Sequence, residues 1–100
     1  MDTLPTGAED FYSIDILVTN PRGLHVRPST MLADICRKYD GRVIIKNEML
    51  EADGSQILDL LMLAAQHNTH LTVLVSKDRP NYLDIAQKIT EVFAKGFGET

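Results

Sequence analysis

The stretch Gly23-Leu24-His25-Val26-Arg27-Pro28 stands between a run that alternates like a β-strand and a run with the period of a helix. On its N-terminal side, apolar residues recur at every second position from Ile14 to Val18, which predicts a strand over residues 11–18 with one buried face. On its C-terminal side, apolar residues recur every three or four positions over residues 28–39, which predicts an amphipathic helix. The histidine is therefore expected where a strand ends and a helix begins.

The remainder of the chain continues with strand and helix signals in turn. Strands are predicted over residues 43–45, 49–52 and 71–76, with a turn near Asn47, and helices over residues 57–65 and 82–95. The strand over residues 71–76 is β-branched and apolar, which favours a central place in a sheet. Helices with one apolar stripe need one apolar sheet face, so this order predicts a two-layer α+β domain. Ferredoxin-like domains share nearly the same order, which alone does not identify a function.

The composition is that of one small globular domain: 100 residues, 44% hydrophobic and 24% charged. Residues 1–10 lack periodicity and are predicted to form a mobile tail, which leaves residues 11–100 as a single domain. The net charge of -4 disfavours nucleic acid or an anionic membrane as a partner. No window approaches the roughly 20 apolar residues of a membrane span. A single cysteine and the lack of a secretory signal favour a cytoplasmic protein.

His25 has the sequence neighbours that a phosphoryl acceptor requires. A histidine accepts a phosphoryl group only when a ring nitrogen keeps a free lone pair, and the positive end of the following helix disfavours the protonated ring. After transfer, the phosphate can be stabilised by amide N–H groups from Val26 through Ser29 and by the guanidinium of Arg27. If each charge-assisted bond contributes about 1.5–3 kcal/mol, a few bonds suffice to tune how readily the group leaves again.

The same stretch resembles the active-site signature of the HPr family, the histidine phosphocarrier proteins of the bacterial phosphoenolpyruvate-dependent phosphotransferase system. The resemblance runs without a gap from about Ile14 to about Leu63 and more loosely to Phe97, and its later parts look closest to the nitrogen-branch members. It implies an open-faced β-sandwich of βαββαβα order, in which three helices cover one face of a four-stranded antiparallel sheet. It also implies that a helix starts directly after His25, whereas sequence rules place Pro28 at the first helical position.

The resemblance implies a stoichiometric phosphocarrier rather than a turnover enzyme, monomeric and without cofactor or metal. His25 would accept a phosphoryl group, through Nδ1, from an enzyme I-type donor and pass it to an enzyme IIA-type acceptor. Gly23 is expected to let the chain turn and leave room for a docking partner. Ile57, Leu58 and Leu61 lie near the positions where relatives present apolar residues to their partners, beside Thr30 on the first helix. Arg22 and Arg27 add positive charge near His25 for acidic partner surfaces.

Two alternatives remain open at this point. The chain could be an HPr-like regulatory protein, whose phosphorylation state controls a transcription factor or an enzyme rather than sugar uptake. It could also be a small-ligand-binding ferredoxin-like domain, in which the motif around His25 would be a coincidence.

One position departs from the family pattern. Many members carry a regulatory serine, phosphorylated by a dedicated kinase, at the start of the second helix. Counted without a gap from His25, that position is Gln56, and Ser55 lies one residue earlier. Ser55 is expected to cap the helix. We therefore expect that such a kinase does not modify this chain.

Overall fold

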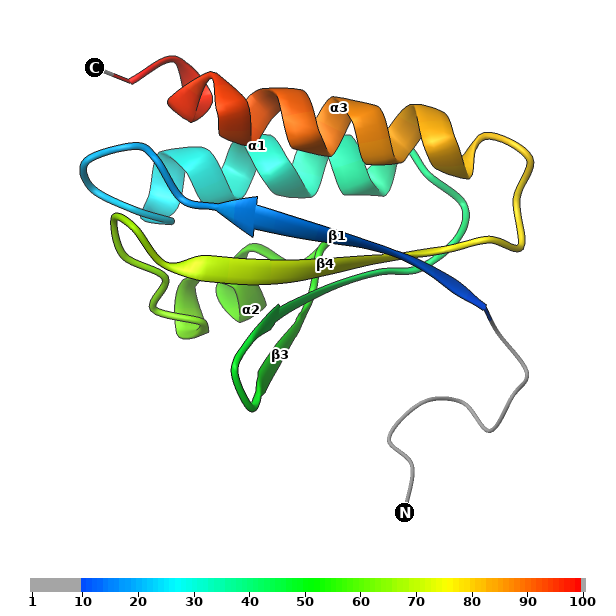
Figure 1. Cartoon of the computed structure of the whole chain (residues 1–100), viewed down its shortest axis with the longest axis horizontal. Helices are drawn as coiled ribbons and strands as arrows, with labels where there is room; N and C mark the ends of the chain where they lie inside the picture. Colours follow the sequence, from blue (N-terminus) through cyan, green and yellow to red (C-terminus); the bar gives the residue numbers. More distant parts are fainter. Residues whose placement is uncertain (1–9, 100) are drawn as a thin grey trace.

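A computed structural model describes residues 10–99, so the predicted tail lies, except for Asp10, outside the described residues. The elements follow the expected order: β1 (Phe11–Leu17), α1 (Val26–Arg37), β2 (Val43–Asn47), β3 (Leu50–Asp53), α2 (Ile57–Met62), β4 (His70–Ser76), α3 (Tyr82–Ala94) and the short 3-10 turn η1 (Gly96–Gly98). The predicted two-layer α+β domain is confirmed. Figure 1 shows α1 and α3 lying side by side, with α2 close to β3.

The four strands form one antiparallel sheet in the order β1-β4-β2-β3. The predicted central strand, β4, pairs with β1 on one side and with β2 on the other. Its side chains Leu71, Val73 and Val75 are buried, which matches the two-residue period of a strand with one face on a core. The expected four-stranded sheet covered on one face by three helices is therefore confirmed.

The start of α1 follows the family resemblance and not the proline rule. The helix begins at Val26, with His25 as its N-cap in an extended backbone conformation. The start directly after His25, which the resemblance implies and which we adopted, is confirmed, whereas the proline rule alone would have placed the start at Pro28. Pro28 instead lies inside the first turn, where its missing N–H removes no helical hydrogen bond.

Helix α2 ends at Met62, three residues before the end predicted from its good helix formers. The chain turns at Ala64, whose φ of 52° lies in the left-handed region. This turn brings the carbonyl of Ala65 within 2.9 Å of the backbone nitrogen of Leu24. Tertiary bonding to the loop before α1 therefore overrides the local helix propensity.

The C-terminal segment is fastened to the core by aromatic packing. Phe93 and Phe97 are both buried, and their rings meet edge to face with centroids 4.9 Å apart. Between them Gly96, with a φ of 58°, turns the chain after α3. Residues beyond α3 are thereby held against the loop that follows β1, and this brings them to His25.

Candidate functional site

His25 is the last residue of the loop between β1 and α1 and the N-cap of α1. It caps the helix through its backbone and not through its side chain. Its carbonyl accepts a hydrogen bond from the N–H of Ser29 at 3.0 Å, while its imidazole makes no capping bond. The side chain is 26% exposed, so the ring is reachable from solvent. The imidazole is therefore available for contacts other than capping.

The imidazole instead meets a carboxylate from the other end of the chain. Nε2 of His25 lies 2.7 Å from Oε2 of Glu99, and the two residues are 74 positions apart in sequence. The other carboxylate oxygen accepts a hydrogen bond from Nδ2 of Asn20 at 3.0 Å. Asn20 is only 1% exposed, and its Nδ2 also donates to the carbonyl of Gly23 at 2.7 Å. Both of these partners are acceptors, which fixes the orientation of the Asn20 amide.

Glu99 is an anion at neutral pH. Its pKa lies below the usual range, first because Asn20 donates a hydrogen bond to the carboxylate. The hydrogen bond to His25 and the charges of His25 and Arg27 lower the pKa further, while desolvation acts in the opposite direction. The sequence offered no signal for this residue, because a single acid near the C-terminus has no local pattern that points to His25.

The start of α1 offers two free backbone donors to a phosphate at His25. The first N–H groups of a helix have no partner within it, and Pro28 has no N–H, so the free donors are the amides of Val26 and Arg27. Ser29 differs from the expectation, because its N–H donates to the His25 carbonyl and its hydroxyl donates to the carbonyl of Leu24 at 3.2 Å. Ser29 is fully buried and committed to the helix start, so we leave it out of the phosphate-binding group.

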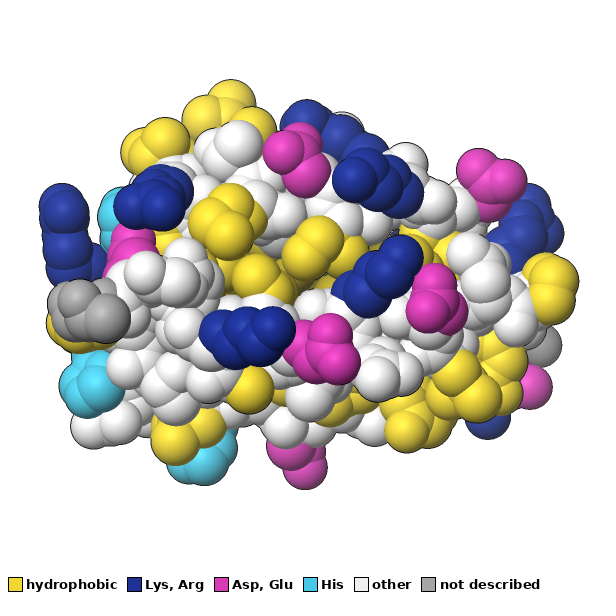
Figure 2. Space-filling model, turned by 90° about the horizontal axis from the view of Figure 1, so that it is seen from above, with side chains coloured by type: hydrophobic (Ala, Val, Ile, Leu, Met, Phe, Trp, Pro, Cys, Tyr) yellow, Lys and Arg dark blue, Asp and Glu magenta, His cyan; other side chains and the backbone are white. Residues whose placement is uncertain are grey.

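Two arginines bring positive charge to this end of the molecule. Arg22 and Arg27 are both exposed, and with Pro21, Gly98 and Glu99 they line a shallow hollow. In Figure 2, basic side chains, an acidic one and a histidine gather at the left-hand end. An anionic group bound in this hollow would meet two guanidinium groups and also the carboxylate of Glu99.

Gly23 has a different purpose from the one expected. Its φ is 67°, and a Cβ at this position would lie 2.3 Å from the carbonyl oxygen of Ala65. The space that Gly23 leaves is therefore filled by the backbone that follows α2, and the expectation of room for a docking partner is wrong. The glycine packs the loop before His25 tightly onto the end of α2.

The residues expected to dock partners differ in exposure. Leu58 is 74% exposed, and Met62 on the same helix, which the sequence did not single out, is 78% exposed. Ile57 and Leu61 are half-buried, as is Thr30, whose hydroxyl donates to the carbonyl of Val26 at 2.8 Å. The exposed apolar side chains of α2 are thus Leu58 and Met62.

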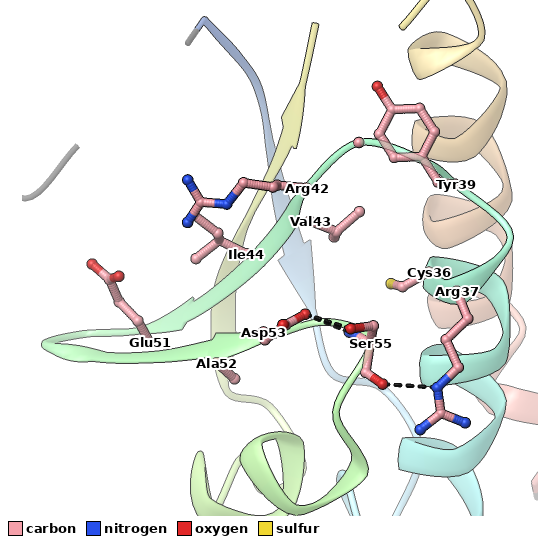
Figure 3. Close-up of a pocket in the computed structure, with 11 residues that line it drawn as sticks. Cys36, Arg37, Tyr39, Arg42, Val43, Ile44, Glu51, Ala52, Asp53 and Ser55 are labelled. Carbon is pink, nitrogen blue, oxygen red and sulfur yellow. Dashed lines mark hydrogen bonds between the residues drawn. The ribbon is translucent and has the colours of Figure 1, made fainter. Parts of the chain in front are cut away.

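Ser55 does not cap α2, so that expectation is wrong. The N-cap is Gln56, and its side chain makes no capping hydrogen bond. Figure 3 shows the reason: Asp53 accepts one hydrogen bond from the hydroxyl of Ser55 at 2.7 Å and another from the N–H of Ser55 at 2.9 Å. Nε of Arg37 donates to the Ser55 carbonyl at 2.9 Å. The serine belongs to a turn closed by Asp53 and not to the helix.

Comparison with known proteins identifies the family. The fold and the site place the chain in the class of small open-faced β-sandwich proteins with a histidine at the start of the first helix. Residues 12–95 match the family described as "PTS HPr component phosphorylation site". The chain is 30% identical over 83 residues to phosphocarrier protein HPr of Chlamydia muridarum, covering 83% of this chain and 78% of that protein. The chain belongs to the HPr family.

The relatives include both HPr and NPr proteins. The chain is 28% identical over 83 residues to phosphocarrier protein NPr of Escherichia coli K12, covering 82% of this chain and 90% of that one. Among solved structures, HPr-C-His of Thermoanaerobacter tengcongensis superposes with a TM-score of 0.81 at 16% identity, over 89% of this chain and 98% of that one. HPr of Bacillus anthracis superposes with a TM-score of 0.76 at 12% identity, over 83% and 96%. These structures confirm the open-faced β-sandwich. Within the described part of the chain, no helix is long and apolar enough to cross a membrane.

Proposed function

We propose that this protein carries a phosphoryl group on Nδ1 of His25, taken from an enzyme I-type donor and passed to an enzyme IIA-type acceptor. The observation that carries the proposal is the position of His25 as N-cap of α1, with its imidazole not used for capping. Membership of the HPr family supports the role of a phosphocarrier.

The transfer exchanges one nitrogen–phosphorus bond for another. The lone pair of Nδ1 forms a bond to phosphorus, the bond from phosphorus to the donor's ring nitrogen breaks, and that nitrogen takes the electron pair. The amides of Val26 and Arg27 and the guanidinium of Arg27 then stabilise the phosphoryl oxygens. At about 1.5–3 kcal/mol for each charge-assisted bond, this set holds the phosphate without making it a dead end.

The exposed side chains near the site supply a surface for partners, which the protein would meet as a monomer. Leu58 and Met62 present apolar area on α2, and Arg22 and Arg27 present positive charge. An interface that combines exposed apolar side chains with charged ones can form and dissociate at each transfer. The two arginines favour donor and acceptor surfaces that are acidic.

The test is labelling with phosphoenolpyruvate and a general enzyme I. We expect acid-labile, base-stable phosphate on the wild-type protein and none on His25→Ala, because only His25 has the free helix amides beside it. His67→Ala is the matched control, since His67 is an exposed histidine in a turn, and it should label like wild type. A wild-type protein without label, or a His25→Ala variant with equal label, would overturn the proposal.

A further inference from the structure

We propose that Glu99 is a positioning residue that reserves Nδ1 of His25 for the phosphoryl group and keeps the phosphorylated ring ready to release it. The inference rests on the proposed function and adds a residue that the helix start does not contain. It follows from the contact between Nε2 of His25 and Oε2 of Glu99 and from the way in which Glu99 is itself held.

The contact determines which ring nitrogen is nucleophilic. A carboxylate only accepts hydrogen bonds, so in the neutral ring the nitrogen that faces Glu99 must be the one that carries the hydrogen. That nitrogen is Nε2, at 2.7 Å. Nδ1 then keeps its lone pair, and within residues 10–99 it takes part in no hydrogen bond. Glu99 thus covers one nitrogen and leaves the other for the phosphoryl donor.

The carboxylate of Glu99 is held in place by hydrogen bonds and by the packing of neighbouring residues. The buried ring of Phe97 anchors the turn, and the N–H of Glu99 donates to the carbonyl of Gly96 at 2.9 Å. Asn20 donates to the second carboxylate oxygen from a buried position, although its own Oδ1 has no partner among the described residues. The hydrogen bonds of the Asn20 amide are therefore those that its Nδ2 donates to Glu99 and to the Gly23 carbonyl.

Glu99 also acts after transfer. Once Nδ1 is bonded to phosphorus, the hydrogen on Nε2 makes the ring a cation, and the neighbouring carboxylate stabilises that cation. When the group moves on, the Nδ1–phosphorus bond breaks, the electron pair returns to Nδ1, and the ring leaves as neutral imidazole with its hydrogen still on Nε2. A phosphorylated ring without that hydrogen would leave as an anion, which is far less favourable. Glu99 therefore keeps the carrier in its transferable form.

Chemical phosphorylation tests this without any partner protein. Phosphoramidate phosphorylates histidine by losing ammonia as the ring nitrogen bonds to phosphorus. NMR couplings then show which nitrogen of His25 carries the phosphate. We expect the wild-type protein to be labelled on Nδ1, whereas Glu99→Ala, which uncovers Nε2, should carry phosphate on both nitrogens.

A second variant isolates the charge. Glu99→Gln keeps the shape but removes the anion, so its Nδ1 adduct should survive about three- to tenfold longer than that of wild type at neutral pH. The difference should fade as pH falls through the lowered pKa of Glu99, because the protonated carboxyl no longer stabilises the cation. Glu91→Gln, an exposed site on α3, is the matched control and should behave as wild type.

The outcomes separate this inference from the proposed function. Equal labelling patterns and equal lifetimes in wild type, Glu99→Ala and Glu99→Gln would overturn the role of Glu99, even if enzyme I still labels His25. A changed pattern in Glu99→Ala together with a longer lifetime in Glu99→Gln would support it, even if enzyme I does not label the protein.

Discussion

Helices α1 and α2 both begin at a position that HPr-family proteins use for phosphorylation, yet their surroundings differ in charge and in free hydrogen-bonding groups. At the start of α1, the first turn holds no acid, and Arg27 is exposed beside His25. At the start of α2, Asp59 lies in the first turn, and Asp53 accepts both donors of Ser55. From these charges we expect a phosphate dianion to be stabilised at the start of α1 and repelled at the start of α2.

Helix length adds to the difference. α1 has 12 residues and α2 has six, so more peptide dipoles are aligned in α1 and its N-terminus has the larger positive partial charge. The single carboxylate at the first start, Glu99, lies on the ring nitrogen that faces away from the proposed phosphate position. At α1 the carboxylate therefore contacts Nε2 and not Nδ1, whereas at α2 both Asp53 and Asp59 lie at the helix start. On this comparison we expect the local side chains, and not the fold, to decide which of the two helix starts accepts phosphate.

The largest effect on this comparison, after loss of His25 itself, should come from Arg27→Ala. Removing the guanidinium deletes one charge-assisted contact of about 1.5–3 kcal/mol, so phosphoryl transfer to His25 should slow about ten- to hundredfold. Rapid-quench labelling with phosphorylated enzyme I measures the rate. Arg79→Ala is the control and should leave the rate unchanged, because the hydrogen bond and the ion pair of the Arg79 side chain within the described chain are both with Asp78. Equal rates for Arg27→Ala and wild type would show that the charge of Arg27 does not assist phosphoryl transfer to His25.

A smaller effect should come from Leu58→Ala on α2. Leu58 is exposed, and truncating an apolar anchor at an interface costs about 1–2 kcal/mol, so KM for the phosphorylated donor should rise about five- to thirtyfold with little change in kcat. Leu83→Ala is the matched control, because Leu83 is 54% exposed on α3. A reduced kcat at unchanged KM, or an equal effect of both variants, would show that Leu58 does not dock the donor. In that case α2 would have neither a phosphorylation site nor a docking role.

The sequence predicted the parts of the site that are close together along the chain. His25, Arg27 and the helix start fall within one short motif, and the element order followed from hydrophobic periodicity. Glu99 could not be predicted, because its contact with His25 depends on how Phe97 packs and on the turn after α3. The early end of α2 was missed for a similar reason, since Ala64 adopts its left-handed conformation where the next carbonyl bonds to the loop before α1. Tertiary contacts decided each of these features.

The smallest expected effect concerns Ser55, and it tests the second half of the comparison directly. A serine kinase of the type that modifies HPr relatives should place no stoichiometric phosphate on this protein. The hydroxyl of Ser55 donates to Asp53, and the turn is held by Arg37, so a kinase would have to break that bond and add a dianion beside a carboxylate. Mass spectrometry after kinase treatment measures the outcome, with a relative that carries the serine as positive control.

The variant Gln56→Ser makes the same test sharper. It restores the family residue at the N-cap of α2, where the present side chain makes no capping bond, and leaves the bonds of Ser55 to Asp53 in place. Phosphate on residue 56 of the variant, with none on Ser55, would show that α2 of the wild-type protein lacks phosphate only because its N-cap is not a serine. Phosphate on neither residue would assign the difference to the acids, Asp53 and Asp59. Stoichiometric phosphate on Ser55 of the wild-type protein would contradict the comparison, because the hydrogen bond of the Ser55 hydroxyl to Asp53 and the nearby negative charge would then not prevent phosphorylation.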